Sequence, residues 1–116
     1  MAVIQRQGNV TISPRVLTEL ISLSARHVPG VARLGVVPHW YVPAVGSKSL
    51  SDGGISVQID SAGVGADCYL IAAPDTNLLE LGITVQATVA AAIRELAGLT
   101  VRAVNVYIQD VEVEHG

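Results

Sequence analysis

The strongest constraint in this sequence is a long amphipathic segment followed directly by a long alternating one. Residues 77–96, NLLELGITVQATVAAAIREL, carry an apolar residue at every third or fourth position, the period of a helix with one buried face. Gly98 follows, where helices commonly end. Apolar and polar residues then alternate between Leu99 and Val113, as in a strand. The two periods together predict a helix layer packed on a sheet.

A second helix is predicted near the N-terminus. Ser13 offers a capping hydroxyl and Pro14 presets the backbone of the first turn. One apolar stripe follows at helical spacing, formed by Val16, Leu17, Leu20 and Ile21.

The stretch ARHVPGV, residues 25–31, ends this helix. Arg26 and His27 place a positive group and a titratable group at the negative end of the helix dipole. Pro29-Gly30 prevents the helix from continuing. No Cys, Asp or Glu in this run supplies a nucleophile or a second ligand. We therefore interpret His27 as a helix cap and not as a catalytic or metal-binding residue.

Three shorter segments also alternate like strands. They are residues 8–13 (GNVTIS), residues 55–60 (ISVQID) and residues 64–73 (VGADCYLIAA), the last two joined by an SAG turn. The resulting order, βαββαβ, predicts an α+β domain, a two-layer sandwich with two helices on one face of a mainly antiparallel sheet. The expected core is Val16, Leu20, Val57, Leu70, Val89, Ile93, Val106 and Ile108, and the expected uncovered face carries Ser56, Gln58, Asn105, Tyr107 and Gln109.

Composition narrows the class of protein. A chain of 116 residues fits a single domain, residues 1–116, and a net charge of -3 without basic blocks argues against nucleic-acid binding. Cys68 is the only cysteine, and the start MAVIQRQG lacks the pattern of a signal peptide, so we expect a cytoplasmic protein. The uncharged stretches fall short of the ~20 apolar residues that span a bilayer, so no direct membrane insertion is expected.

Residues 35–54, GVVPHWYVPAVGSKSLSDGG, form an excursion that we expect to be a loop or an extra hairpin. It contains Trp40 and Tyr41, which either form an exposed contact patch or pack against the aliphatic sheet. Together with Tyr107 on the uncovered face, Trp40 and Tyr41 are the candidate partner-binding residues.

The remaining reactive side chains favour structural roles. Cys68 lies on the inward phase of its strand, which predicts an inert thiol, while Asp60 and Asp67 lie near a turn and are expected to be solvated. The tail residues Asp110, Glu112, Glu114 and His115 suit a divalent cation, but a frayed, solvated end is the simpler interpretation. No phosphate-binding, nucleotide-binding, CxxC or GxSxG motif is present, so we predict no catalytic residue, metal or cofactor.

Roughly from Gly8 to Val113, the chain resembles the alkaline-shock, or general-stress, envelope proteins of Gram-positive bacteria. The matching pieces are Ile-Ser-Pro and Val-Pro-Gly-Val within residues 8–35, ISVQID, the Val-Gln-Ala-Thr-Val helix leading to Gly98-Leu99, and the late Val-Asn-Val. Residues 36–52 and the AAPDT stretch at 72–76 depart from the family pattern.

This resemblance implies a small non-enzymatic cytosolic protein of the envelope stress response. Such a protein is docked at the membrane by a membrane-anchored protein partner and can self-assemble as a homo-oligomer. The alternative is a small enzyme whose site forms at an oligomer interface, from His39, Asp60 and Asp67.

Overall fold

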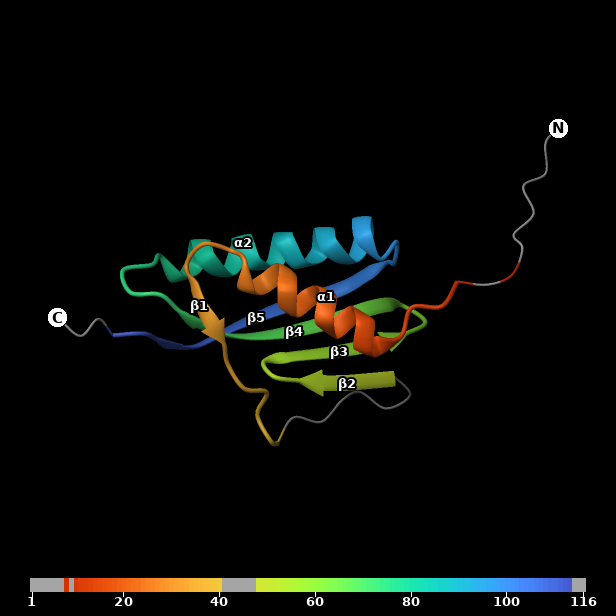
Figure 1. The fold of residues 1–116 in the computed structure, drawn as a ribbon, viewed down its shortest axis with the longest axis horizontal. Coiled ribbons are helices and arrows are strands. Elements are labelled where there is room, and N and C mark those ends of the chain that lie inside the picture. The colour runs from red at the N-terminus through yellow and green to blue at the C-terminus, as the bar shows by residue number, and fades with distance from the viewer. Residues whose placement is uncertain (1–7, 9, 41–47, 114–116) are drawn as a thin grey trace.

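The structure is a computed structural model that describes residues 8, 10–40 and 48–113. One five-stranded sheet carries a layer of helices on one face, which confirms the predicted α+β class (Figure 1). The elements in chain order are α1 (Pro14–Arg26), β1 (Val31–Leu34), β2 (Lys48–Asp52), β3 (Ile55–Asp60), β4 (Gly63–Ala72), α2 (Leu78–Ala91), the π-helical turn η1 (Ala92–Leu96) and β5 (Val101–Val111).

β4 is the central strand of the sheet. Along one edge it pairs in parallel with β5, and α2 with η1 supplies the crossover that a parallel pair requires. Along the other edge it pairs antiparallel with β3 through residues 63–68 and then with β1 through residues 70–72. β2 adds to β3 as an antiparallel outer strand. The sheet is therefore mainly antiparallel, as predicted.

The strand predicted at residues 8–13 is wrong, because the described part of this segment is irregular up to the start of α1. Val10 is 93 % exposed, and Ile12 is partly buried against the core without joining the sheet. β1, at residues 31–34, takes the free stretch of β4 instead. A short alternation is a weak signal, and pairing with β4 decides which segment becomes a strand.

The predicted excursion at 35–54 ends as a hairpin. Residues 48–52 form β2, which turns at Gly53-Gly54 into β3, and Gly53 has the positive φ of +58° that favours glycine in a tight turn. Residues 41–47 lie outside the described part of the chain.

α1 begins at the predicted cap, Ser13, and α2 begins at a cap that was not predicted, Asn77. Ser13 Oγ accepts a hydrogen bond from the Val16 N–H at 3.3 Å, and Asn77 Oδ1 accepts one from the Glu80 N–H at 3.0 Å. Gly98, with φ of +68°, follows η1. Neither α1 nor α2 with its π-helical turn, nor any other described helix, is long and apolar enough to cross a membrane.

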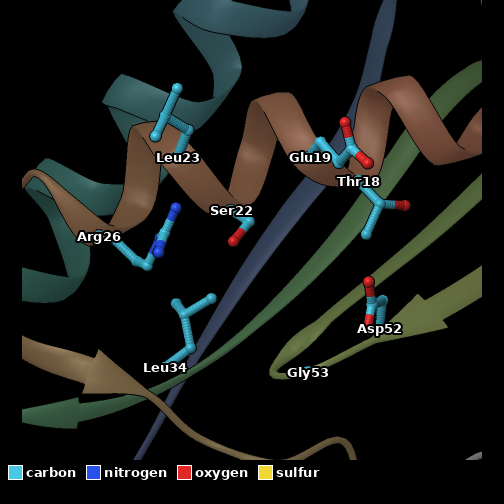
Figure 2. Close-up of a pocket in the computed structure, with 8 residues that line it drawn as sticks. All are labelled: Thr18, Glu19, Ser22, Leu23, Arg26, Leu34, Asp52 and Gly53. Atoms are coloured by element: carbon cyan, nitrogen blue, oxygen red, sulfur yellow. The ribbon is translucent and has the colours of Figure 1, made fainter.

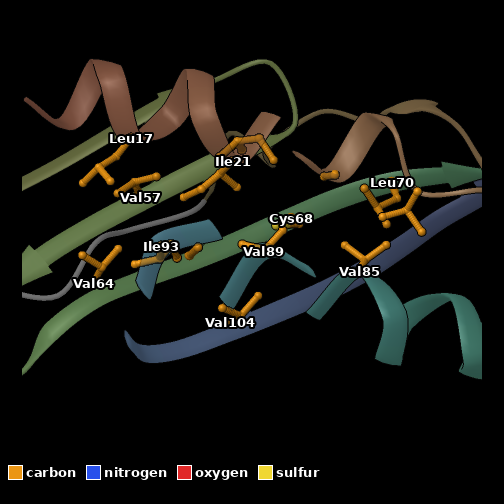
Figure 3. Packing of buried hydrophobic residues seen from close by; sticks show 14 of the residues in the cluster. Leu17, Ile21, Val57, Val64, Cys68, Leu70, Val85, Val89, Ile93 and Val104 are labelled. Carbon is orange, nitrogen blue, oxygen red and sulfur yellow. The ribbon is translucent and has the colours of Figure 1, made fainter. Parts of the chain in front are cut away.

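A single aliphatic core lies between helices and sheet (Figure 3). Val57, Leu70, Val89 and Ile93 are fully buried, as predicted, and Val106 and Ile108 are half-buried against the same cluster.

The predicted face of α1 is rotated by one residue. Leu17 and Ile21 are fully buried, whereas Val16 is 53 % exposed and Leu20 is only partly buried. The apolar pairs 16–17 and 20–21 fit two helix phases about 100° apart, and contact with the sheet selects one of them.

Candidate interaction surface

The sheet face opposite the helices, called here the open face, carries a row of polar and aromatic side chains. Strand register places Gln58 next to Gly65, Asp67 next to Asn105, and Tyr69 next to Tyr107. These residues occupy the alternate positions to the core residues of their strands. The predicted uncovered face is therefore present and is extended by Asp67 and Tyr69 from β4.

Asp67 is the centre of a hydrogen-bonded network on the open face. Its Oδ2 accepts from Gln58 Nε2 at 3.0 Å, and its Oδ1 accepts from Asn105 Nδ2 at 3.0 Å. Gln58 Nε2 also donates to Ser56 Oγ at 3.0 Å. Asp67 is only 5 % exposed, so the prediction that it is a solvated carboxylate is wrong.

Arg102 connects this network to Asp60. Its terminal nitrogen donates to Gln58 Oε1 at 3.4 Å, and its Nε lies 3.5 Å from Asp60 Oδ2. The guanidinium reaches across the sheet over Gly65, where a Cβ would collide with it. Asp60 also accepts from the Ala62 N–H at 2.8 Å and is half-buried, so it too is more constrained than predicted. The sequence signal for this network is a polar residue at the outward phase of three different strands.

Tyr69 and Tyr107 stack on the open face with ring centroids 4.7 Å apart and planes inclined by 13°. Such an offset pair contributes about 0.5–1.5 kcal/mol beyond the burial of its surface. Tyr69 is 5 % exposed and Tyr107 is 45 % exposed, so Tyr107 is the outer ring of the pair. A partner can therefore contact Tyr107 without displacing it from its stack.

The base of the excursion is tied to the same face. The Val36 N–H donates to Gln109 Oε1 at 2.9 Å, and Gln109 Nε2 donates back to the Val36 carbonyl at 2.8 Å. Gly35 allows this approach, because a side chain there would run into Gln109. The structure thus brings the start of the excursion to the end of β5 that carries Tyr107.

Trp40 is 70 % exposed, which contradicts the alternative in which it packs against the sheet. His39 is exposed as well. Tyr41, the third candidate partner-binding residue, lies outside the described residues. Trp40 and Tyr107 are both available to a partner.

The side chains considered as candidate reactive groups have structural roles. His27 is the C-cap of α1 and its Nδ1 lies 2.7 Å from the Leu23 carbonyl oxygen, as the capping interpretation predicts. Burial raises the pKa of the Cys68 thiol to about 12, with the Asp67 carboxylate adding to the shift, so the thiol stays protonated. Across residues 10–40 and 48–113, no hydrogen bond or ion pair joins His39 to Asp60 or Asp67.

The acidic tail is held partly by an ion pair. Glu112 Oε1 accepts from the Arg33 guanidinium at 2.8 Å, and Asp110 Oδ1 accepts from the Val111 N–H. Glu114 and His115 lie outside the described residues. Among the residues that are described, no group of three His, Cys, Asp or Glu side chains is placed to hold a metal ion.

A cleft of about 390 Å³ lies between α1 and the β2–β3 turn (Figure 2). Its charged groups are exposed: Glu19 pairs with Arg15 at 3.4 Å, and Arg26 and Asp52 lie on opposite walls. The sequence offered no signal for it, because three separate elements line it. The lining is Thr18, Glu19, Ser22, Leu23, Arg26, Leu34, Asp52 and Gly53, which includes no nucleophile paired with a base.

Comparison with known proteins finds a family whose model matches this chain and solved structures that have a similar fold. The model of the alkaline-shock protein family, which is described as having a cell envelope-related function, matches residues 3–113. No curated protein matches the chain. A solved structure described as MamM CTD, copper form, is 17% identical, with a TM-score of 0.56 over 88% of this chain and 90% of that one. A single-residue variant of MamM CTD is 19% identical, with a TM-score of 0.51 over 84% of this chain and 95% of that one. At these identities the likeness concerns the fold alone.

Proposed function

Because this chain belongs to the alkaline-shock protein family, whose function is related to the cell envelope, we propose that it is a non-enzymatic interaction module of envelope homeostasis. It acts in the cytoplasm, at the periphery of the membrane, and docks there through a membrane-anchored protein partner. Self-assembly as a homo-oligomer is part of this function.

The observation that carries the proposal is the exposure of two aromatic side chains, Trp40 in the excursion and Tyr107 beside a rigid polar network on the open face. Trp40 is 70 % exposed and Tyr107 is 45 % exposed. Buried aromatic anchors supply much of the free energy of protein association. The hydrogen bonds around Asp67 and the Tyr69 stack hold the surroundings of Tyr107 in place, so little ordering free energy is lost on binding.

Electrostatics and burial favour a protein partner over a lipid surface. The net charge is -3, and the residues around Tyr107 on the open face are neutral or acidic apart from two arginines. Arg102 is engaged by Asp60 and Gln58, and Arg33 is paired with Glu112. Anionic headgroups attract clusters of basic residues, which this face lacks in the part of the chain that is described. Asn105 donates a hydrogen bond to Asp67, and this polar pair lies at the border of the surface where Tyr107 would contact a partner.

The experiment compares membrane flotation of the purified protein with fractionation of cells that express variants. The pure chain is expected to stay away from liposomes, while the same chain in cells sediments with membranes. The double variant Trp40→Ser, Tyr107→Ser is expected to move to the soluble fraction, because loss of two anchors at about 2 kcal/mol or more each weakens binding by several hundred-fold or more.

The matched control is Leu23→Ser, which removes an exposed apolar side chain, 50 % accessible, from α1 on the other side of the molecule. It is expected to stay with the membrane, and thermal melts verify that each variant is folded. Binding of the pure chain to liposomes would refute the proposal that a protein partner docks it at the membrane. A folded Trp40→Ser, Tyr107→Ser variant that remains with membranes would place the docking surface elsewhere.

A further inference from the structure

β5 leaves one long edge of the sheet unpaired. It pairs with β4 on one side, and no described strand pairs with its other side. The strand contains no proline, and its two register irregularities lie near its ends, which leaves Ala103–Ile108 regular. A long, regular edge without such interruptions is a template for pairing with another strand.

The backbone groups on this edge can be assigned from one hydrogen bond. Gln86 Nε2 donates to the Val104 carbonyl at 2.8 Å, so that carbonyl is directed away from β4. Because peptide groups alternate in direction along a strand, Val106 and Ile108 present their N–H and C=O groups to the same side. Gln86 is exposed, so its amide can return to water when another donor takes its place.

An apolar groove of about 290 Å³ runs beside this edge, between α2 and β5. Its rim includes Leu79, which is 75 % exposed, and Ile83, which is 56 % exposed, although the opposite side of α2 buries Leu81 and Val85 in the core. Figure 1 shows α2 running along the β5 side of the sheet. α2 therefore has a second apolar side, and it lies next to the free strand.

We propose that a second copy of this chain occupies the edge and the groove, with the two β5 strands paired antiparallel about a two-fold axis at Val106. This inference deepens the self-assembly in the proposed function and rests on it. In this register Val106 faces Val106 of the other copy, and Val104 faces Ile108. Each of these pairs exchanges two backbone hydrogen bonds through the groups that point away from β4.

The sequence of β5 is self-complementary in this register. On the helix side, Val104 meets Ile108, and on the open face Asn105 meets Tyr107, so apolar residues face apolar ones and polar residues face polar ones. The strand end with Arg102 lies beside the end with Asp110 of the other copy, whereas a parallel arrangement would bring like charges together. A two-fold dimer also places both α2 helices side by side and covers Leu79 and Ile83.

The register is tested by oxidative cross-linking of single cysteine variants in the full chain. Val106→Cys places the two thiols opposite each other, within the Cα separation that a disulfide bridges. Ala103→Cys is the matched control on the same strand, since its two copies lie roughly 20 Å apart in the proposed register. Cys68 is buried and remains silent. We expect rapid dimeric cross-linking of Val106→Cys only; equal cross-linking of both variants, or of neither, would overturn the register.

The groove is tested by measuring mass in solution by light scattering. The wild type is expected at twice the chain mass, and Ile83→Lys is expected to raise the dissociation constant at least tenfold, because it leaves a charge in a dry contact. Leu23→Lys, on α1, is the matched control and should stay dimeric. A monomeric wild type, or a folded Ile83→Lys variant with unchanged mass, contradicts the dimer. Neither result touches the docking proposal, which membrane fractionation of Trp40→Ser, a substitution outside β5, tests separately.

Discussion

Among the individual side chains, Asp67 is the one whose surroundings most differ from expectation. Both of its oxygens accept hydrogen bonds on the open face, from Gln58 and Asn105, and it is almost completely buried. A buried carboxylate is tolerated where donors replace its water shell. Its role is to order the polar surface next to Tyr107. This role cannot be seen in the sequence, where Asp67 is only a carboxylate near a turn.

Replacing Asp67 with Ala is expected to lower the free energy of unfolding by about 1–3 kcal/mol, because the buried Gln58 amide loses an acceptor. Denaturant unfolding measures the change. Asp52→Ala, which removes an exposed carboxylate, is expected to change the free energy by less than about 0.5 kcal/mol. Equal effects of the two substitutions would mean that Asp67 is solvated after all.

The Cys68 thiol makes stability depend on alkaline pH. Desolvation by burial, with a contribution from Asp67, raises the pKa of the folded thiol from 9.0 to about 12. Between these values the unfolded chain loses this proton and the folded chain keeps it, so the stabilisation present below pH 9 is lost as pH rises toward 12.

The free energy of unfolding of the wild type is therefore expected to fall by up to about 1.4 kcal/mol per pH unit in that window relative to Cys68→Ala. Denaturant unfolding of both proteins at several alkaline pH values measures the difference, and tyrosine titration is common to both. Parallel pH profiles of the two proteins would show that the thiol ionises in the folded state.

Among the helices and strands, the phase of α1 decides which side chains hold the helix on the sheet. Leu17→Ala is expected to cost about 2–5 kcal/mol, because it opens a cavity in the core. Val16→Ala, one position away, removes a largely exposed side chain and is expected to cost less than about 0.5 kcal/mol. Unfolding midpoints in urea compare the two variants. A larger effect at Val16 would restore the phase predicted from the sequence.

Across the entire domain, the proposals assign two functions to two surfaces, which meet at Tyr107 on β5. Trp40 in the excursion and Tyr107 on the open face dock the partner, and the β5 edge with the α2 groove joins two copies. Ile83→Lys is therefore expected to lower the mass in solution from that of a dimer to that of a monomer. Each monomer keeps its docking surface, so membrane association is expected to remain at least in its weaker, monovalent form. Trp40→Ser, which lies outside β5, is expected to weaken membrane association while its mass in solution stays dimeric. Light scattering and fractionation of both variants measure this independence, and a joint loss of both properties in either variant contradicts it.

Much of the fold and of the candidate surface was predictable from local sequence. The helix periods, the cap at Ser13, the β3–β4 hairpin and the outward phase of Tyr107 were each expected and are present. These features depend on residues within a few positions of one another, so the chain encodes them before any long-range contact forms. The family resemblance, which extends over most of the chain, is likewise a property of the sequence.

Other features depend on contacts between distant parts of the chain. Packing on the sheet selected Leu17 over Val16, and β1 rather than residues 8–13 took the free stretch of β4. The burial of Asp67 depends on Asn105, which lies 38 positions away, and on Arg102 crossing the sheet over Gly65. A short strand or a buried polar side chain has little stability of its own, because its free energy comes from partners that only the folded chain brings together.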